Sequence, residues 1–123
     1  MSKAMVWTGR VLSTLLVLAL LAGIVFAFAK PDDVKKQMAP YGYPANSVMP
    51  IVVAEACCVI LYAIPQTSVL GAILLTGYLG GAVSTHVRAG ESTWWMAVLV
   101  GVIAWLALLL REPRLKGLLP LRR

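Results

Sequence analysis

The sequence predicts an all-α protein, a transmembrane four-helix bundle with a short interfacial helix between the first and second spans. The chain is 60% hydrophobic and has a mean hydropathy of +0.85, above the usual range of soluble domains. Its apolar residues gather in four runs of roughly spanning length. The later runs are joined by only a few residues, which makes neighbouring spans antiparallel. We expect one integral membrane domain over residues 1–123.

The predicted spans cover residues of about 6–29, 50–64, 66–88 and 93–110. Backbone groups cannot stay unpaired in hydrocarbon, so each span is expected to be a helix. The first run is too long for the apolar part of a cleaved signal peptide, and three further runs follow it. The second run is bounded by Pro50 and Pro65 and would reach only about 22 Å at 1.5 Å per residue. We therefore expect it to lie within protein or thinned lipid.

The longest connection, residues 31–47, has the features of a short helix. Pro31 suits the first helical position, and the acidic pair after it favours the positive end of the helix dipole. We expect this helix to lie at the membrane interface and to end near Gly42, with a tyrosine on either side at headgroup level.

Basic residues are distributed unevenly about the spans, and the formal net charge is +6. One side carries Lys3, Arg10, Arg111, Arg114, Lys116, Arg122 and Arg123, and the other carries Lys30, Lys35, Lys36 and Arg88. The richer side is expected to be cytoplasmic, which makes the chain a multi-pass protein of the bacterial inner membrane with both termini in the cytoplasm. The basic tail 111–123 should lie along the leaflet and bind anionic lipid headgroups. Nucleic acid is not expected, because the basic residues flank apolar runs.

Small residues recur at four-residue spacing in the third span. Gly77 and Gly81 form one such pair, and Gly80 and Ser84 form another. This pattern lets membrane helices approach closely, so we interpret these four residues as a helix-packing surface. The pattern does not choose between a partner helix in the same bundle and one in another chain. We expect partners to be other membrane subunits or further copies of the chain.

Glu55 lies near the middle of the second span, about 15 Å along the axis from Pro65. A charged carboxylate there costs on the order of 3 kcal/mol, so Glu55 should face the bundle interior and be protonated or paired. Tyr62 falls near its face of the helix, and Thr76 and Tyr78 of the third span lie at a similar depth. These four residues could form an intramembrane proton or small-molecule site. Alternatively, a neutral Glu55 only donates a hydrogen bond between helices.

His86, the only histidine, is expected near the outer interface, with Arg88 two residues further on. We include both in the candidate polar site. A lone interfacial histidine is usually solvated or hydrogen-bonded, but it could be an acid/base group or one axial ligand of a haem or chlorophyll-type pigment. The chain has no nucleophile elbow, HExxH or P-loop, so no catalytic residue is assigned. We expect no metal site and no cofactor, with quinone or haem as the alternatives.

The stretch LYAIPQTSVLGAILLTGYLGGAVSTHVRAG, residues 61–90, closely resembles the signature region of the DoxX-like family of small four-helix bacterial membrane proteins. WTGR at 7–10 and YGYP at 41–44 fit the family in the same order. The resemblance implies a fold and a membrane location more than an activity. Relatives are similar to subunits of thiosulfate:quinone oxidoreductases and of oxidative-stress complexes, or act as assembly factors. The family pattern marks Pro65, Gly71, Thr76, Gly77, Tyr78, Gly80, Gly81, Thr85, His86 and Arg88.

One departure from the family pattern bears on function. Many relatives carry a further histidine near the start of the fourth span, where this chain has STWWM at 92–96. A two-histidine site within one chain is therefore not expected. We favour a non-catalytic accessory or assembly subunit of a larger membrane complex, such as an oxidoreductase complex. The alternatives are a quinone- or haem-associated subunit of a membrane oxidoreductase, and a small membrane enzyme acting on a lipophilic metabolite.

Overall fold

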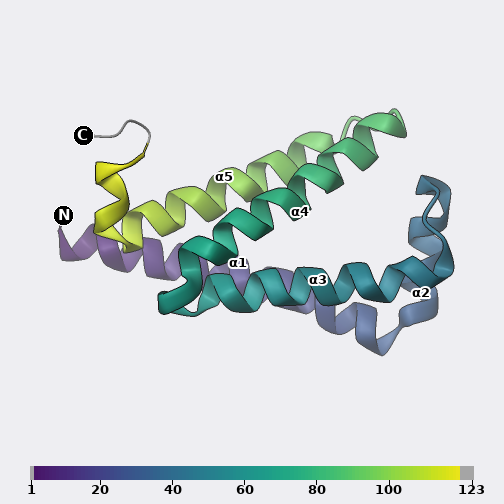
Figure 1. Ribbon diagram of the computed structural model, residues 1–123, viewed down its shortest axis with the longest axis horizontal. Helices are drawn as coiled ribbons and strands as arrows, with labels where there is room; N and C mark the ends of the chain where they lie inside the picture. The colour runs from purple at the N-terminus through teal and green to yellow at the C-terminus, as the bar shows by residue number, and fades with distance from the viewer. Residues whose placement is uncertain (1, 120–123) are drawn as a thin grey trace.

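The structure, a computed structural model, describes residues 2–119. Four long helices lie along one another (Figure 1): α1 (Lys3–Ala29), α3 (Ala45–Ala63), α4 (Ser68–Arg88) and α5 (Trp94–Arg111). Each is long and apolar enough to cross a membrane, α4 together with the turn that precedes it. No strand occurs in residues 2–119. The predicted all-α, multi-pass four-helix bundle is confirmed.

Short helices lie between α1 and α3, between α3 and α4, and after α5. Helix α2 (Pro31–Met38) follows α1 directly and continues into η1 (Ala39–Tyr41). Gly42 ends this segment with φ +87°, a left-handed conformation that glycine adopts without a Cβ clash. The helix predicted between the first two spans is therefore present, with its predicted end. The turn η2 (Pro65–Thr67) joins α3 to α4, and η3 (Pro113–Gly117) follows α5.

Helix α3 differs from the sequence prediction at its start. It begins at Ala45 rather than at Pro50, and Pro50 lies inside it. The helix therefore has 19 residues, which correspond to about 28 Å, so the predicted short span was wrong. The extra turn buries Val48 completely. That burial favours helix over an extended entry and offsets the backbone hydrogen bond that Pro50, in the second turn, cannot donate.

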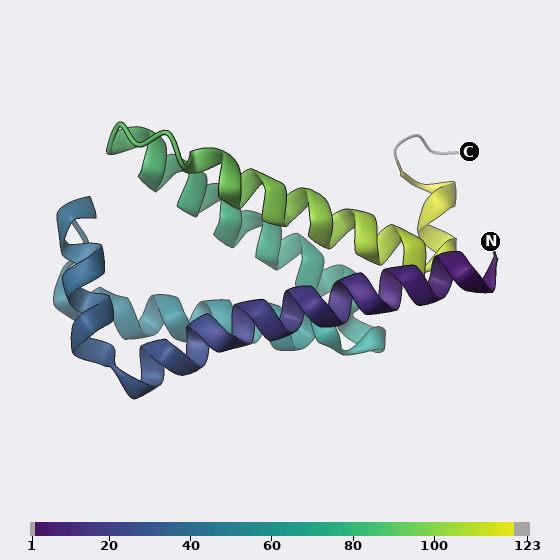
Figure 2. The same ribbon diagram turned by 180° about the vertical axis from the view of Figure 1, so that it is seen from behind.

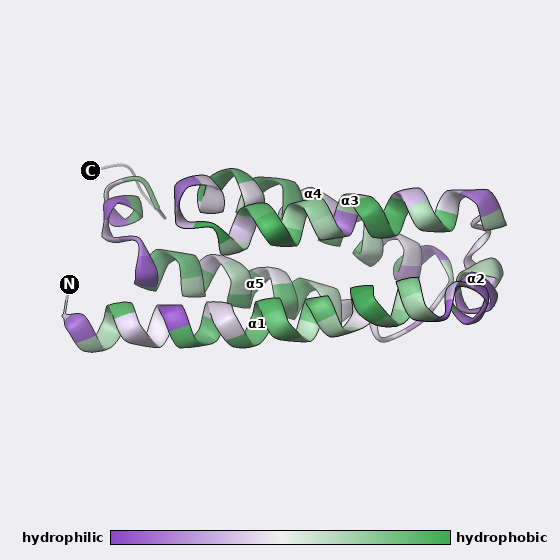
Figure 3. Ribbon diagram, turned by 90° about the horizontal axis from the view of Figure 1, so that it is seen from below, coloured by the Kyte–Doolittle hydropathy of each residue, from purple (hydrophilic) through white to green (hydrophobic). Residues whose placement is uncertain are grey.

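The four long helices form a ring in which each packs mainly against two others. Helix α1 packs against α3 and α5, and α4 packs against the same two helices. Every neighbouring pair is antiparallel, so α1 begins at the end of the bundle where η3 lies (Figure 1). We call this end the terminal end and the opposite one the α2 end. Hydropathy follows the same axis, because most of the strongly hydrophilic segments lie at the two ends and mostly apolar ribbon fills the length between them (Figure 3).

The bundle is tight at the terminal end and wider at the α2 end, where α4 and α5 diverge from α1 and α3 (Figure 2). Two glycines explain the tight end. A Cβ built on Gly9 would lie 2.5 Å from the backbone nitrogen of Arg111, and one built on Gly71 would overlap the backbone of Tyr62. Only glycine lets α1 approach α5, and α4 approach α3, this closely.

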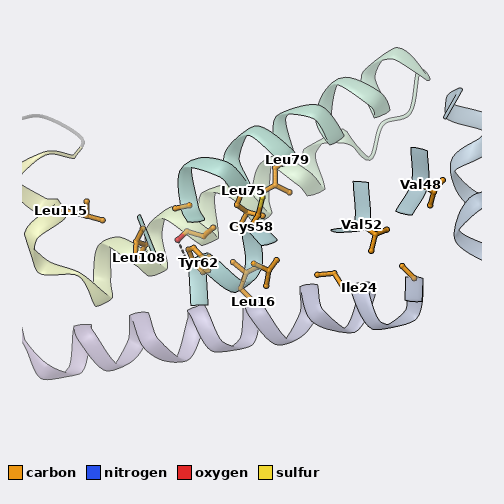
Figure 4. Close-up of a cluster of buried hydrophobic side chains, with 14 residues drawn as sticks. Leu16, Ile24, Val48, Val52, Cys58, Tyr62, Leu75, Leu79, Leu108 and Leu115 are labelled. Carbon is orange, nitrogen blue, oxygen red and sulfur yellow. Dashed lines mark hydrogen bonds between the residues drawn. The ribbon is translucent and has the colours of Figure 1, made fainter. Parts of the chain in front are cut away.

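The core runs along the bundle axis and includes part of the tail (Figure 4). Its fully buried large side chains are Tyr62, Leu75, Leu108, Val48 and Val59. Leu115 of η3 belongs to the same cluster and is 7% exposed. The described start of the tail therefore packs onto the bundle through Leu115, and the position of the tail along the leaflet stays a prediction. Residues 120–123 of the predicted tail lie outside the described residues.

Candidate functional site

Glu55 of α3 and Tyr78 of α4 contact each other in the middle of the spans. The Tyr78 hydroxyl donates a hydrogen bond of 3.0 Å to Oε2 of Glu55. Both side chains are half-buried at the α3–α4 interface. The carboxylate is thus given a hydrogen-bond donor at a depth where water supplies none, which reduces the cost of placing it there. Two of the four predicted intramembrane polar residues form this pair.

Tyr62 lies in a different cluster nearer the terminal end. Its hydroxyl donates to the carbonyl of Ala104 at 2.6 Å and lies 3.4 Å from Oγ of Ser13. Nη2 of Arg111 donates to the Tyr62 carbonyl at 2.5 Å, and the guanidinium lies 4.7 Å from the centre of the Tyr62 ring. Tyr62 shares a face with Glu55 but stands two turns, about 10 Å, further along α3. Helices α1 and α5 offer nearer partners there, so the predicted four-residue cluster does not form.

Thr76 also points away from Glu55. Its hydroxyl donates to the carbonyl of Ala72 at 2.7 Å and accepts a hydrogen bond of 2.7 Å from Nε1 of Trp105. It therefore connects α4 to α5. Thr76 and Tyr78 are two residues apart, which places them about 200° apart around the helix, and only one of them can face α3.

His86 lies at the α2 end beside the segment after α2. Its Nδ1 is 2.8 Å from the carbonyl of Ala82, and its ring centre is 5.5 Å from that of Tyr41. The neighbouring Thr85 hydroxyl lies 2.6 Å from the hydroxyl of Tyr43. These two tyrosines hold the connection against α4. Sequence reasoning placed them at headgroup level but not in the site, although both belong to the YGYP stretch that resembles the family.

Neither Arg88 nor His86, the remaining predicted residues, contacts the Glu55–Tyr78 pair. Arg88 is exposed, and His86 is eight residues from Tyr78, which is about 12 Å along the helix. With Nδ1 at a carbonyl, His86 could offer Nε2 as a single ligand. Within residues 2–119, no three His, Cys, Asp or Glu side chains come together as a metal site.

The small-residue surface of α4 consists of Gly77, Gly80, Gly81 and Ser84, and all four are exposed. A Cβ built on any of the three glycines would meet nothing within 4 Å. These residues therefore do not pack against another helix of the described chain. Beside them lies an apolar groove of 710 Å³ between α4 and α5, whose lining includes Gly80, Val83, Gly101 and Trp105.

Comparison with known proteins supports the resemblance seen in the sequence. A family model described as the DoxX-like family matches residues 11–108. No curated protein and no solved structure matches the chain. The matched region contains the Glu55–Tyr78 pair and the small-residue surface of α4.

Proposed function

We propose that this chain, which belongs to the DoxX-like family, is a non-catalytic accessory subunit that binds a transmembrane helix of a different membrane protein through α4. The single observation that carries this proposal is the uncovered small-residue surface of Gly77, Gly80, Gly81 and Ser84. Apolar lipid provides little hydrophobic force between helices, so association depends on close backbone approach and van der Waals contact. A row of glycines facing outward provides such an approach.

Two other glycines in the chain support this interpretation. Gly9 and Gly71 each sit directly against the backbone of a neighbouring helix, and both lie at the tight end of the bundle. At Gly77, Gly80 and Gly81 the same residue type has open space around it. Glycine costs about 1 kcal/mol relative to alanine within a helix. A helix from outside the chain would offset that cost here, as α5 and α3 do at the terminal end.

The partner is proposed to be a different protein because of Arg88. This exposed residue is seven positions beyond Gly81, so it lies on the same side of α4, two turns closer to the α2 end. Copies of one protein share their orientation in a membrane, so a symmetric pair joined through this surface would bring two Arg88 side chains to the same level. Like charges disfavour that contact. A partner helix with an acidic or polar group at the level of Arg88 would bind this surface favourably. The apolar side chains of that helix would enter the groove of 710 Å³.

We further propose that the terminal end faces the cytoplasm in a bacterial inner membrane. The basic residues flanking the spans are more numerous at that end. This distribution is the positive-inside pattern.

Site-specific photocrosslinking in the native membrane tests the proposal. A photoreactive residue in place of Leu74, which is exposed on the same side of α4, should capture one defined protein of a different mass. Gly81→Leu should abolish the adduct. Gly23→Leu is the matched control, because Gly23 of α1 is equally open and the substitution is identical. An adduct between two copies, or an adduct that survives Gly81→Leu, contradicts the proposal.

A second candidate function rests on the Glu55–Tyr78 pair. The Tyr78 phenol or a protonated Glu55 could donate a hydrogen bond to a quinone carbonyl, and the Glu55 carboxylate could accept one from a hydroxyl of a lipophilic metabolite. In that case protein purified in mild detergent should carry an extractable quinone or metabolite, and Glu55→Gln or Tyr78→Phe should remove it. Haem association through Nε2 of His86 would instead give a visible absorption band that His86→Ala abolishes. Purified protein without any bound small molecule would leave the accessory function as the better account.

A further inference from the structure

A second cavity, of 480 Å³, opens at the terminal end of the bundle. Three helices contribute its polar and aromatic lining: Trp7, Arg10 and Thr14 from α1, Ser68 from α4, and Arg111 with the next residue, Glu112, at the end of α5. Because α5 ends at Arg111, the cavity lies at the level where the apolar span gives way to the interface. It is distinct from the Glu55–Tyr78 pair and from the small-residue surface of α4.

Arg111 is held rigidly in this cavity. Its Nη2 donates to the carbonyl of Tyr62, and its guanidinium stacks on the Tyr62 ring at 4.7 Å. Its Nε is buried and has no hydrogen-bond acceptor among residues 2–119. A buried donor without an acceptor is unusual in a folded protein, so this N–H group is available to donate a hydrogen bond to a ligand atom.

Arg10 places a second guanidinium at the same cavity from the opposite helix. Its Cζ lies 5.1 Å from the centre of the Trp7 ring. No ion pair of Arg10 occurs among the described residues. The contact between Gly9 and the backbone of Arg111 brings this part of α1 directly against α5. Two guanidinium groups, each placed over an aromatic ring, thus line one cavity because a glycine lets their helices touch.

The acidic residue in the lining does not neutralise both arginines. Oε1 of Glu112 forms an ion pair of 2.9 Å with Nε of Arg114, and the second carboxylate oxygen accepts from Nη2 of Arg114 at 3.3 Å. Arg114 holds the pKa of Glu112 below its ordinary value, so the carboxylate stays charged and engaged with Arg114 at neutral pH. The positive charges of Arg10 and Arg111 remain available to a ligand.

We propose that the cavity lined by Arg10 and Arg111 binds a phosphate group, supplied either by a phospholipid headgroup from the adjacent leaflet or by a free phosphate anion. Planar guanidinium groups bind phosphate oxygens through paired N–H donors. The unpaired Nε of Arg111 supplies a donor that such an oxygen would satisfy. The interfacial position of the cavity matches the level of lipid phosphates, beside the exposed Trp7.

Ligand titrations of the purified protein in neutral detergent test this proposal. Native mass spectrometry and thermal unfolding would be followed with dioctanoyl phosphatidylglycerol, with dioctanoylglycerol, which has the same chains without phosphate, and with sodium phosphate against sodium chloride of equal ionic strength. Saturable binding of phosphatidylglycerol but not of dioctanoylglycerol supports a lipid source. Saturable stabilisation by sodium phosphate supports a free anion. Equal responses to both diacyl ligands, with none to phosphate, overturn the proposal.

Variants then assign the binding to the two arginines. Arg10→Gln should weaken phosphate binding by about tenfold or more, the usual effect of losing a charge-assisted hydrogen bond. Arg10 is exposed, so this variant should fold even if Arg111→Lys does not. Lys3→Gln removes the same charge from the same end of α1 outside the cavity and should leave affinity unchanged. Glu112→Gln should raise the affinity for phosphate, because it removes the negative charge from the cavity lining. Equal losses in Arg10→Gln and Lys3→Gln would overturn the assignment, because they would show only general charge attraction.

Discussion

The hydroxyl of Tyr78 and the carboxylate of Glu55 join α4 to α3 through a hydrogen bond of 3.0 Å in the middle of the membrane-spanning segments. The two helices are also joined at the terminal end, where Gly71 lies against the backbone of Tyr62. The Glu55–Tyr78 bond therefore lies between the tight end and the part of the bundle where α4 diverges. Its loss should loosen the α3–α4 pair beyond that point.

A double-mutant cycle measures this bond. Tyr78→Phe leaves the carboxylate without its donor, and Glu55→Met removes both the charge and the acceptor. We expect Tyr78→Phe to destabilise the protein more than Glu55→Met does, with a coupling of about 0.6–2 kcal/mol, as for other hydrogen bonds between membrane helices. Unfolding in mixed micelles of increasing denaturing detergent would give the values. Additive effects of the two substitutions would show that the bond does not stabilise the fold.

Alanine substitutions at Gly71 and Gly77 should have opposite effects on stability. In Gly71→Ala the new Cβ overlaps the backbone of Tyr62, so α4 must move away from α3, at a cost of about 1–3 kcal/mol. In Gly77→Ala the Cβ enters open space, and the higher helix propensity of alanine should stabilise the monomer by up to about 1 kcal/mol. The same unfolding measurement applies to both. A destabilised Gly77→Ala monomer would mean that another part of the chain covers this surface.

Depth along the membrane axis was predictable from the sequence, because it depends only on counting residues from a turn. Spans of the right length and type follow from the apolar runs, and counting in both directions from the turn near Pro65 places Glu55 and Tyr78 at one level. The start of α3 was not predictable in this way. Pro50 suggested a boundary, and only the tertiary burial of Val48 shows that the helix begins a turn earlier.

The direction in which each side chain faces around its helix axis could not be predicted by counting residues. Thr76 has a suitable depth but faces Trp105 of α5, and Tyr62 is drawn to Ser13 and the carbonyl of Ala104. These partners come from α1 and α5, whose close approach depends on the contact at Gly9. The same limit applies to Gly77, Gly80 and Gly81, because their spacing predicts a packing surface but not what covers it.

Labelling of single cysteines tests the proposed orientation. In a background with Cys57 and Cys58 replaced by serine, a cysteine at Ser2 or Gly117 lies at the terminal end, and one at Glu91 lies in the α4–α5 connection at the α2 end. A maleimide that cannot cross the inner membrane should label Glu91→Cys in intact cells with a permeabilised outer envelope. It should label Ser2→Cys and Gly117→Cys only after lysis. The reverse pattern would invert the orientation, and opposite sides for Ser2 and Gly117 would contradict the fold.

The pH dependence of the α2 end should depend on Tyr41 and Glu91. A side-chain interaction with Glu91 is the main effect that raises the pKa of Tyr41 above its ordinary value of 10.0, and burial and then the negative charge of Glu91 raise it further. The neutral phenol is therefore favoured in the folded state. The resulting stabilisation is complete below the ordinary pKa of tyrosine and is lost as the pH rises through the higher folded value. Glu91→Gln should return the pKa of Tyr41 towards 10.0.

Carbon-13 NMR of protein labelled at the tyrosine Cζ atoms can follow this titration, with Tyr41→Phe identifying the signal. Glu112→Gln, at the terminal end, is the matched control and should leave the Tyr41 titration unchanged. If Tyr41 titrates identically in the original protein and in Glu91→Gln, the carboxylate does not reach it. The connection after α2 would then be held against α4 by the Tyr43–Thr85 hydrogen bond and the Tyr41–His86 ring contact alone.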